Sequence, residues 1–122
     1  NWIPDILHCH DWQAALVPVY LRTLFRNSPV GRARTILTIH NLRFQGIYNI
    51  PTIQYWTGLP DEVFDMGALK QGYEDANMLK GGLAYADRIT NTEKRLKNIC
   101  VIIVINLGES STELTMKCGT PM

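Results

Sequence analysis

The chain has 122 residues, a length that fits one domain with a buried core of its own. Its formal net charge of +1 argues against a large electrostatic surface for nucleic acid or for anionic lipid, and no segment is long and apolar enough to span a bilayer. The three cysteines have no metal-ligand spacing, so we expect reduced thiols in a cytoplasmic protein. The chain begins at Asn1 and enters a strand within a few residues, which indicates a fragment.

The first predicted strand, from Ile6 to Cys9, leads into a polar cluster. Side chains alternate along a strand, so His8 and His10 share one face, and Asp11 follows at the carboxyl end. Asp11 also sits where a helix N-cap would sit, because apolar residues recur at helical spacing after it. A structural N-cap role for Asp11 is therefore the alternative to a functional one.

An amphipathic helix is predicted from Trp12 to about Arg26. Pro18 counts against a regular first turn, because its ring removes one backbone donor. We therefore expect either a kink or a later start of this helix.

A second predicted strand, from Thr35 to Ile39, ends at His40 and Asn41. Strand, helix and strand form a βαβ unit with a right-handed crossover, so both strands finish at the same edge of a parallel sheet. His10 and Asp11 should then meet His40 and Asn41 where ligands bind in open α/β sheets. The alternative for His40 is a histidine that caps the sheet edge through a backbone carbonyl.

Further elements follow Gly46. Helices are predicted at 51–56 with Gly58 as terminator, from residue 60 to 64, and from Glu74 to Ala86, with a loop around Gly67 and Gly72. Gly81 and Gly82 lie inside the last helix at a cost of about 1 kcal/mol each, which suggests close packing against a neighbour. A third strand is expected to begin at 87–90, and the apolar run 99–105 fits a buried strand.

Several short motifs occur together in this chain. They are HCHDWQA at 8–14, TIHNL at 38–42, FQG at 44–46, LKGGL at 79–83 and YADRIT at 85–90. In this order and spacing they resemble bacterial glycogen synthases, the ADP-glucose-dependent glycogen/starch synthase family. The resemblance implies a GT-B glycosyltransferase, in which two Rossmann-like domains enclose the donor nucleotide and the glucan. The expected fold is α/β, a partial Rossmann-like parallel sheet with flanking helices. Residues 1–90 would form part of the N-terminal, acceptor-side domain, and 91–122 a divergent tail.

The resemblance also implies an activity: transfer of glucose from ADP-glucose to the non-reducing end of an α-1,4-glucan, with retention. No metal and no cofactor is expected, since ADP-glucose is a co-substrate. His40 would contact the transferred glucose with support from Asn41, and Asp11 would line the sugar pocket. Trp12 would offer a face to a glucan ring, or else be ordinary core. The implied catalytic residues are thus His40 and Asp11, and the implied substrate-binding residues are Asn41, Trp12, His10 and Gln45.

Two alternatives to the synthase remain open at this stage, and one further motif needs an interpretation. The LKGGL segment resembles the family's Lys-x-Gly-Gly-Leu donor loop, but it lies in a helical pattern and is interpreted as helix packing without a phosphate role. A metal-dependent hydrolase could use His8, His10 and His40 as ligands. A non-catalytic glucan-binding piece is the second alternative. The chain alone is expected to be inactive, because the family's diphosphate-binding residues lie outside it.

Overall fold

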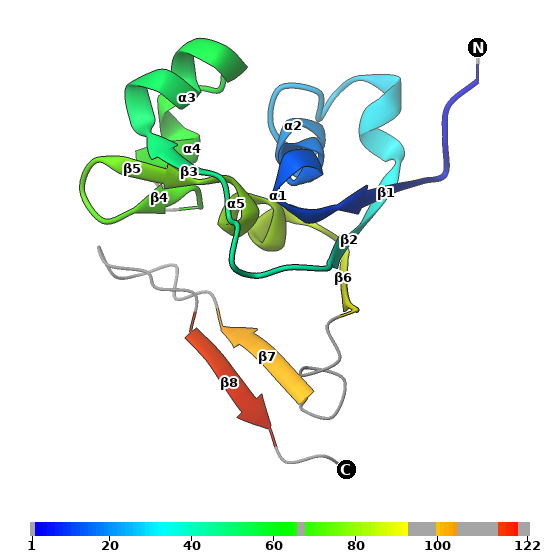
Figure 1. Cartoon of the computed structure of the whole chain (residues 1–122). Coiled ribbons are helices and arrows are strands. Elements are labelled where there is room, and N and C mark those ends of the chain that lie inside the picture. The colour runs from blue at the N-terminus through cyan, green and yellow to red at the C-terminus, as the bar shows by residue number, and fades with distance from the viewer. Residues whose placement is uncertain (1, 66–67, 93–99, 105–114, 120–122) are drawn as a thin grey trace.

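The computed structural model describes residues 2–65 and 68–92, and the backbone of 100–104 and 115–119 (Figure 1). Its main feature is a parallel three-stranded sheet in the order β1 (Ile6–His10), β2 (Arg34–Ile39) and β6 (Arg88–Asn91). The register places His10 beside Thr38, and Thr38 beside Thr90. All three strands therefore finish at one edge, as the strand–helix–strand pattern predicts.

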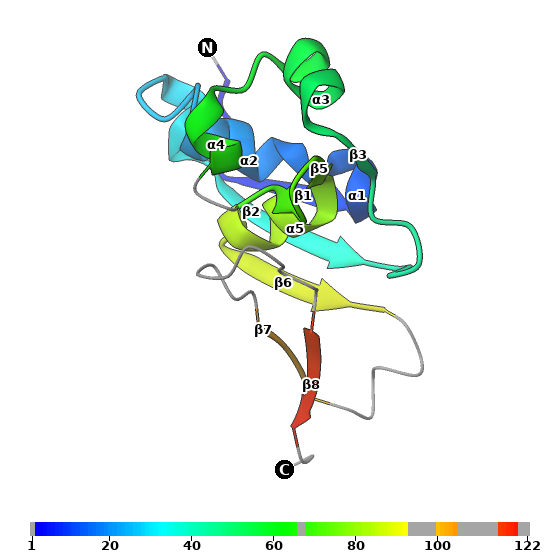
Figure 2. The same ribbon diagram turned by 90° about the vertical axis from the view of Figure 1, so that its left-hand side faces the viewer.

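One face of this sheet is covered by helices α1 (Asp11–Ala14), α2 (Leu16–Arg22) and α5 (Met78–Tyr85) (Figure 2). The strand side chains on this face are buried against the helices in one apolar cluster, made of Cys9, Ala15, Leu37, Ile39, Leu79 and Leu83. The alternate strand positions carry polar side chains on the other face, among them His8, His10 and Thr38. The pleat thus separates an apolar, helix-covered face from a polar one.

The first helical segment is shorter than the sequence predicts, and it is interrupted. The helix breaks at Ala15, because Pro18 has no N–H to donate to the carbonyl of Ala14; this confirms the expected kink. The predicted end at Arg26 was wrong. Thr23 leaves the helical conformation at φ −121° and ψ −93°, and its hydroxyl donates to the Val19 carbonyl at 2.7 Å.

The predicted helix over 74–86 also begins later than expected. Residues Asp75–Asn77 form β5, which pairs antiparallel with β3 (Ile47–Asn49) and β4 (Lys70–Gln71) in a second, smaller sheet. The helix starts after Asn77, whose side chain accepts a hydrogen bond from the Lys80 N–H at 2.9 Å. Strands of two or three residues are too short to show a periodicity, so the sequence did not indicate this sheet.

Helices α3 (Ile50–Thr57) and α4 (Asp61–Asp65) lie where the sequence predicts them, and a 3₁₀ turn, η1 (Pro29–Arg32), precedes β2. Asn49 caps α3, and Gly58 ends it in a left-handed conformation at φ +67°. A second apolar cluster joins these helices to α2 and the small sheet, with Val19, Ile53, Val63, Phe64 and Leu69 as members. Gly72 lies in the turn between β4 and β5, whereas Gly67 lies outside the described residues.

The two glycines of α5 allow a close helix contact. A Cβ added to Gly82 would lie 2.7 Å from the carbonyl oxygen of Ala15, and one added to Gly81 would lie 2.6 Å from Leu69 Cδ1. The close packing predicted for this pair is therefore confirmed. Lys80 is only 1% exposed, donates to the carbonyl of Lys70, and has its pKa lowered by burial. The LKGGL segment thus packs as a helix, as interpreted from the sequence.

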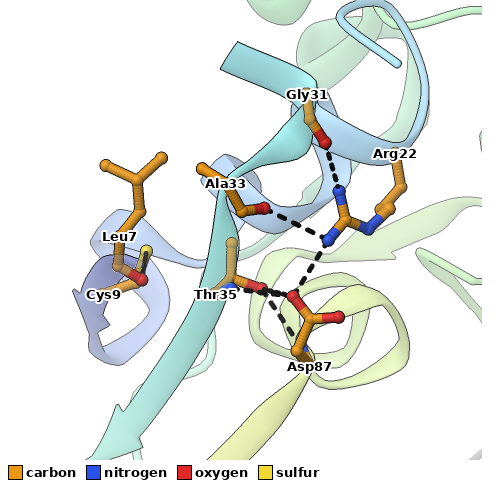
Figure 3. A network of polar contacts seen from close by, with 7 residues as sticks. All are labelled: Leu7, Cys9, Arg22, Gly31, Ala33, Thr35 and Asp87. Carbon is orange, nitrogen blue, oxygen red and sulfur yellow. Dashed lines mark hydrogen bonds and ion pairs between the residues drawn. The ribbon is translucent and has the colours of Figure 1, made fainter. Parts of the chain in front are cut away.

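Asp87 joins the amino ends of β2 and β6 to α2 (Figure 3). Its Oδ2 accepts from the Thr35 N–H at 2.8 Å and from Arg22 Nη2 at 2.9 Å, and its own N–H donates to Thr35 Oγ1. Arg22 also donates to the carbonyls of Gly31 and Ala33. The hydrogen bond from the Thr35 backbone, together with the Arg22 guanidinium, holds the pKa of Asp87 below its usual value against the opposing effect of desolvation.

Beyond residue 92, β7 (Cys100–Val104) pairs antiparallel with β8 (Thr115–Gly119), so that Ile102 lies opposite Lys117. The strand expected within 99–105 is confirmed over its central part, and its two end residues lie outside the described part; β8 was not predicted. The boundary at residue 90 stays a prediction. Among the described residues, no helix has the length and apolar character needed to cross a bilayer.

Replacing Gly82 by alanine is expected to lower the free energy of unfolding by about 1–3 kcal/mol, because the new methyl group meets backbone atoms of Ala15 that cannot turn aside. Urea denaturation measures this. Ala84→Ser on the exposed side of the same helix is the control, expected within about 0.5 kcal/mol of the unmodified chain. Equal stabilities for the two variants would contradict the close contact.

Replacing Asp87 by asparagine is expected to change how stability depends on pH. A carboxyl group with a lowered folded pKa stabilises above its unfolded pKa, near 3.8, and loses this effect as the pH falls through the lower folded value. The unmodified chain should therefore exceed Asp87→Asn by about 1 kcal/mol at pH 6, since the side chain is a third exposed. Urea denaturation at pH 6 and pH 3 should show this difference shrink; a constant difference would contradict it.

Candidate functional site

The ends of β1 and β2 are joined by the carboxylate of Asp11. Its Oδ1 accepts hydrogen bonds from the backbone N–H of His40 at 2.7 Å and of Asn41 at 3.3 Å. Asp11 follows β1 directly, and His40 follows β2 directly. The predicted convergence of these residues at one edge of the sheet is therefore confirmed, and their contact is side chain to main chain.

Asp11 has an unusual backbone conformation. Its φ is +57°, the only positive value at a non-glycine position in the part of the chain that the structure describes. The left-handed region costs an ordinary residue about 1–2 kcal/mol, although aspartate tolerates it better than most. The N-cap of α1 is His10, without a side-chain hydrogen bond, so the alternative of Asp11 as a simple N-cap was wrong. The two charge-assisted hydrogen bonds to the next strand hold the strained residue in place.

A hollow of about 340 Å³ lies beside this junction, lined by Asp11, Trp12, Gln13, Asn41 and Phe44. This volume is at the small end of the range for ligand sites, which suits a ligand of the size of a hexose. A carboxylate and amides stand next to two aromatic rings, an arrangement that can bond sugar hydroxyls and cover the apolar face of a sugar. Gln13 and Phe44 were given no role from the sequence, although each stands inside one of the quoted motifs.

Trp12 belongs both to the core and to the surface of the site. Its ring is half-buried and packs against both apolar clusters. The backbone at Gly46, with φ +68°, packs directly against the indole ring. Only glycine allows this approach, because a Cβ at this position would lie 2.5 Å from Trp12 Cε3. Trp12 also lines a second hollow of about 290 Å³ together with Gln45 and Tyr48. Trp12 is therefore part of the core and also lines both hollows. Its role as a platform for a glucan ring stays a prediction.

His40 and His10 lie at the edge of the sheet but do not line either of these hollows. Both are exposed; His10 Nδ1 lies 3.0 Å from His40 Nε2, and the rings stack at a centroid distance of 5.2 Å. The other ring nitrogen of His40, Nδ1, lies 2.7 Å from Thr92 Oγ1. The imidazole of His40 is thus bonded to side chains on both neighbouring strand ends, and not to a carbonyl as the edge-capping alternative required.

The side chains of Asn41 and Gln45, predicted to bind substrate, already make hydrogen bonds within the protein. Asn41 Oδ1 accepts from the Arg43 N–H at 2.9 Å. Gln45 donates from Nε2 to the Leu42 carbonyl, and its Oε1 accepts from Asn77 Nδ2 at 2.7 Å. Gln45 therefore holds its loop onto the start of α5, and Asn41 keeps a face toward the hollow. A substrate role for either residue stays a prediction.

The histidines are not arranged as a metal site. His8 Nε2 lies 2.6 Å from Thr38 Oγ1, and the His10–His40 contact is a nitrogen-to-nitrogen hydrogen bond. Within residues 2–65 and 68–92, no group of three His, Cys, Asp or Glu side chains is placed to hold an ion. The geometry gives the hydrolase alternative no support.

Two substitutions of Asp11 distinguish the contribution of its hydrogen bonds from the cost of its left-handed backbone conformation. Asp11→Ala is expected to lower the free energy of unfolding by about 1–3 kcal/mol, because two amides lose their acceptor and the left-handed φ is kept. Asp11→Gly removes the same hydrogen bonds but relieves the φ, so it should be about 1 kcal/mol more stable than Asp11→Ala. Urea denaturation measures both differences. An Asp11→Ala variant as stable as the unmodified chain would show that the two hydrogen bonds from the His40 and Asn41 amides to Asp11, here called the Asp11 clamp, do not stabilise the fold.

Comparison with known proteins is consistent with this geometry. Residues 1–100 match the family described as the starch synthase catalytic domain. A glycogen synthase of Lachnospira eligens is 49% identical over 92 residues, which are 75% of this chain and 19% of that protein. A glycogen synthase of Thermotoga petrophila is 48% identical over 87 residues, 70% of this chain and 18% of that protein. The chain thus spans about a fifth of the length of these curated relatives.

A solved structure agrees with the fold. The catalytic domain of Starch Synthase IV from Arabidopsis thaliana, bound to ADP and acarbose, aligns with a TM-score of 0.61 at 27% identity, over 71% of this chain and 18% of that one. The predicted fold class, α/β with a parallel sheet and flanking helices as in a GT-B domain, is confirmed. None of these relatives supports a hydrolase. The chain belongs to the starch synthase catalytic domain family, a family of glycosyltransferases.

Proposed function

We propose that this chain supplies the acceptor-side part of a glycogen or starch synthase active site. The complete enzyme would transfer glucose from ADP-glucose to the non-reducing end of an α-1,4-glucan with retention of configuration. The observation that carries this proposal is the Asp11 clamp on His40 and Asn41 beside a hollow of about 340 Å³. The family match and the relatives named glycogen synthase support the same reaction.

The chemistry of glucosyl transfer explains why a rigid strand end is useful. Positive charge develops on the sugar and negative charge on the departing diphosphate, so the glucose must be held in one orientation. In our proposal Asp11 fixes the main chain at His40 and Asn41. His40 then contacts the transferred glucose from the sheet edge, with support from Asn41, which lines the adjacent hollow. Trp12 and Phe44 offer apolar ring surface to the glucan. ADP-glucose enters as a co-substrate, and the proposed reaction needs neither a metal nor a further cofactor.

The proposed partners are a nucleotide sugar and a glucan. They are supported by the structural relative, whose solved form is bound to ADP and acarbose. Nucleic acid and membranes are not proposed as partners, given the net charge of +1. We also propose a cytoplasmic location. Cys9, the cysteine whose side chain the structure describes, is free and buried, and burial raises the pKa of its thiol, as suits an unreactive reduced thiol.

A second candidate function is glucan binding without catalysis. Three aromatic rings contact one another in a row, with Trp12 6.3 Å from Tyr48 and Tyr48 6.0 Å from Trp56 between centroids. Trp56 is 65% exposed. Such a surface can hold a sugar chain by ring contacts alone.

Activity within a complete enzyme separates these functions, whereas the isolated chain should behave alike under both. The purified chain is expected to be retarded weakly by glycogen in native gels but to incorporate no glucose from ADP-glucose, because it spans only a fifth of its relatives. Residues 2–92 placed in the Lachnospira eligens glycogen synthase should give an active chimaera. In this chimaera Asp11→Ala is expected to lower kcat about 100-fold, since small misplacements at a reacting centre are costly.

Tyr73→Ala is the control variant, because Tyr73 is 83% exposed in the turn before β5 and touches none of the site residues named above. It should keep the full rate of the chimaera. Robust transfer by the chain alone, or an Asp11→Ala chimaera as active as the Tyr73→Ala one, would contradict the proposal.

A further inference from the structure

Two rows of hydrogen-bonded side chains cross the sheet near its carboxyl edge. The first row runs from His8 on β1 through Thr38 on β2 to Thr90 on β6, with distances of 2.6 and 2.5 Å. The second row runs from His10 through His40 to Thr92, with distances of 3.0 and 2.7 Å. The rows lie side by side, because the rings of His8 and His10 are 4.3 Å apart between centroids. Only the second row contains a residue to which we assign a role in glucosyl transfer.

We propose that His10 and Thr92 are positioning residues that fix the tautomer and the ring orientation of His40. The proposal rests on the proposed function, in which His40 faces the transferred glucose. His10 Nδ1 holds Nε2 of the ring and Thr92 Oγ1 holds Nδ1, so the imidazole is bonded on both sides. The backbone of the same residue is held by Asp11. Side chain and main chain of His40 are thus held by three residues, two at the end of β1 and one that follows β6.

Proton counting leaves few states for this row. A neutral imidazole has one donor nitrogen and one acceptor nitrogen. In one arrangement His10 Nδ1–H donates to His40 Nε2, and His40 Nδ1–H donates to Thr92 Oγ1. In the other, all donors reverse: the Thr92 hydroxyl donates to His40 Nδ1, and His40 Nε2–H donates to His10 Nδ1. The Thr92 hydroxyl also lies 3.4 Å from the Ile39 carbonyl, to which it can only donate. This contact favours the first arrangement, in which His40 carries its proton on Nδ1.

The test uses variants that keep or remove single hydrogen-bonding atoms. Thr92→Val has the same shape as threonine without the hydroxyl, and Thr92→Ser keeps the hydroxyl. His10→Phe keeps a ring for stacking but has no nitrogen, and His10→Asn keeps a polar atom near the position of Nδ1. Matched controls come from the first row: His8→Phe and Thr90→Val remove the same chemical groups from neighbours that do not bond to His40.

Nitrogen-15 NMR of the histidine rings in the 122-residue chain at neutral pH reads out the tautomer directly. In the unmodified chain, the two ring nitrogens of His40 should give separate protonated and unprotonated signals. Thr92→Val and His10→Phe should move them toward the averaged values of a free imidazole, while Thr92→Ser, His10→Asn and both controls should not. Backbone amide spectra show that each variant is folded. Averaged His40 signals in the unmodified chain, or equal effects of the two rows, would overturn the proposal.

Kinetics of the chimaera give the second readout. Thr92→Val and His10→Phe should each lower kcat about tenfold with KM changed less than about threefold, as expected for the loss of one orienting hydrogen bond. A change in KM alone would overturn the positioning role. An inactive chimaera with a fixed His40 tautomer would instead contradict the proposed function and leave the positioning inference supported.

Discussion

The carboxylate of Asp11 accepts hydrogen bonds from two successive amides at the end of the neighbouring strand, and the geometry of the site depends on this contact. It requires β1 and β2 to be parallel and in register, so that both strands end together. It also requires Asp11 to adopt a positive φ, a cost that the hydrogen bonds offset. The same turn places Trp12 against the loop at Gly46 and beside the hollow that Asp11 and Asn41 also line.

The central strand β2 is held in the same way at both ends. At its amino end the Thr35 N–H donates to the carboxylate of Asp87, and at its carboxyl end the His40 N–H donates to that of Asp11. Between these anchors, Leu37 and Ile39 are buried against the helices. The glycines of α5 let that helix approach Ala15 closely enough to close this core. Core packing and two carboxylates together fix where the strand stops, and with it the position of the site.

The sequence was informative where a residue type has one dominant physical role. The β-branched run before His40, the alternation around His8 and His10, and the paired glycines of α5 each predicted a feature that the structure contains. The small sheet was missed, because its strands are too short for a periodic pattern and Asp75–Asn77 fits a helix equally well. The hydrogen-bond partners of Asp11 were missed for another reason. An aspartate before a helix usually accepts hydrogen bonds from the first amides of that helix. Here the register of β1 with β2 brings the amides of His40 and Asn41 to its carboxylate instead.

The clamp between Asp11 and His40 is the central claim, and a scalar coupling across the hydrogen bond tests it most directly. A long-range HNCO spectrum of the isotope-labelled chain should show a cross-peak between the backbone nitrogen of His40 and the side-chain carboxyl carbon of Asp11. Couplings across the backbone hydrogen bonds between β1 and β2 provide the reference in the same spectrum. Strand couplings without the Asp11–His40 cross-peak would show a folded sheet without the clamp, and would contradict this account.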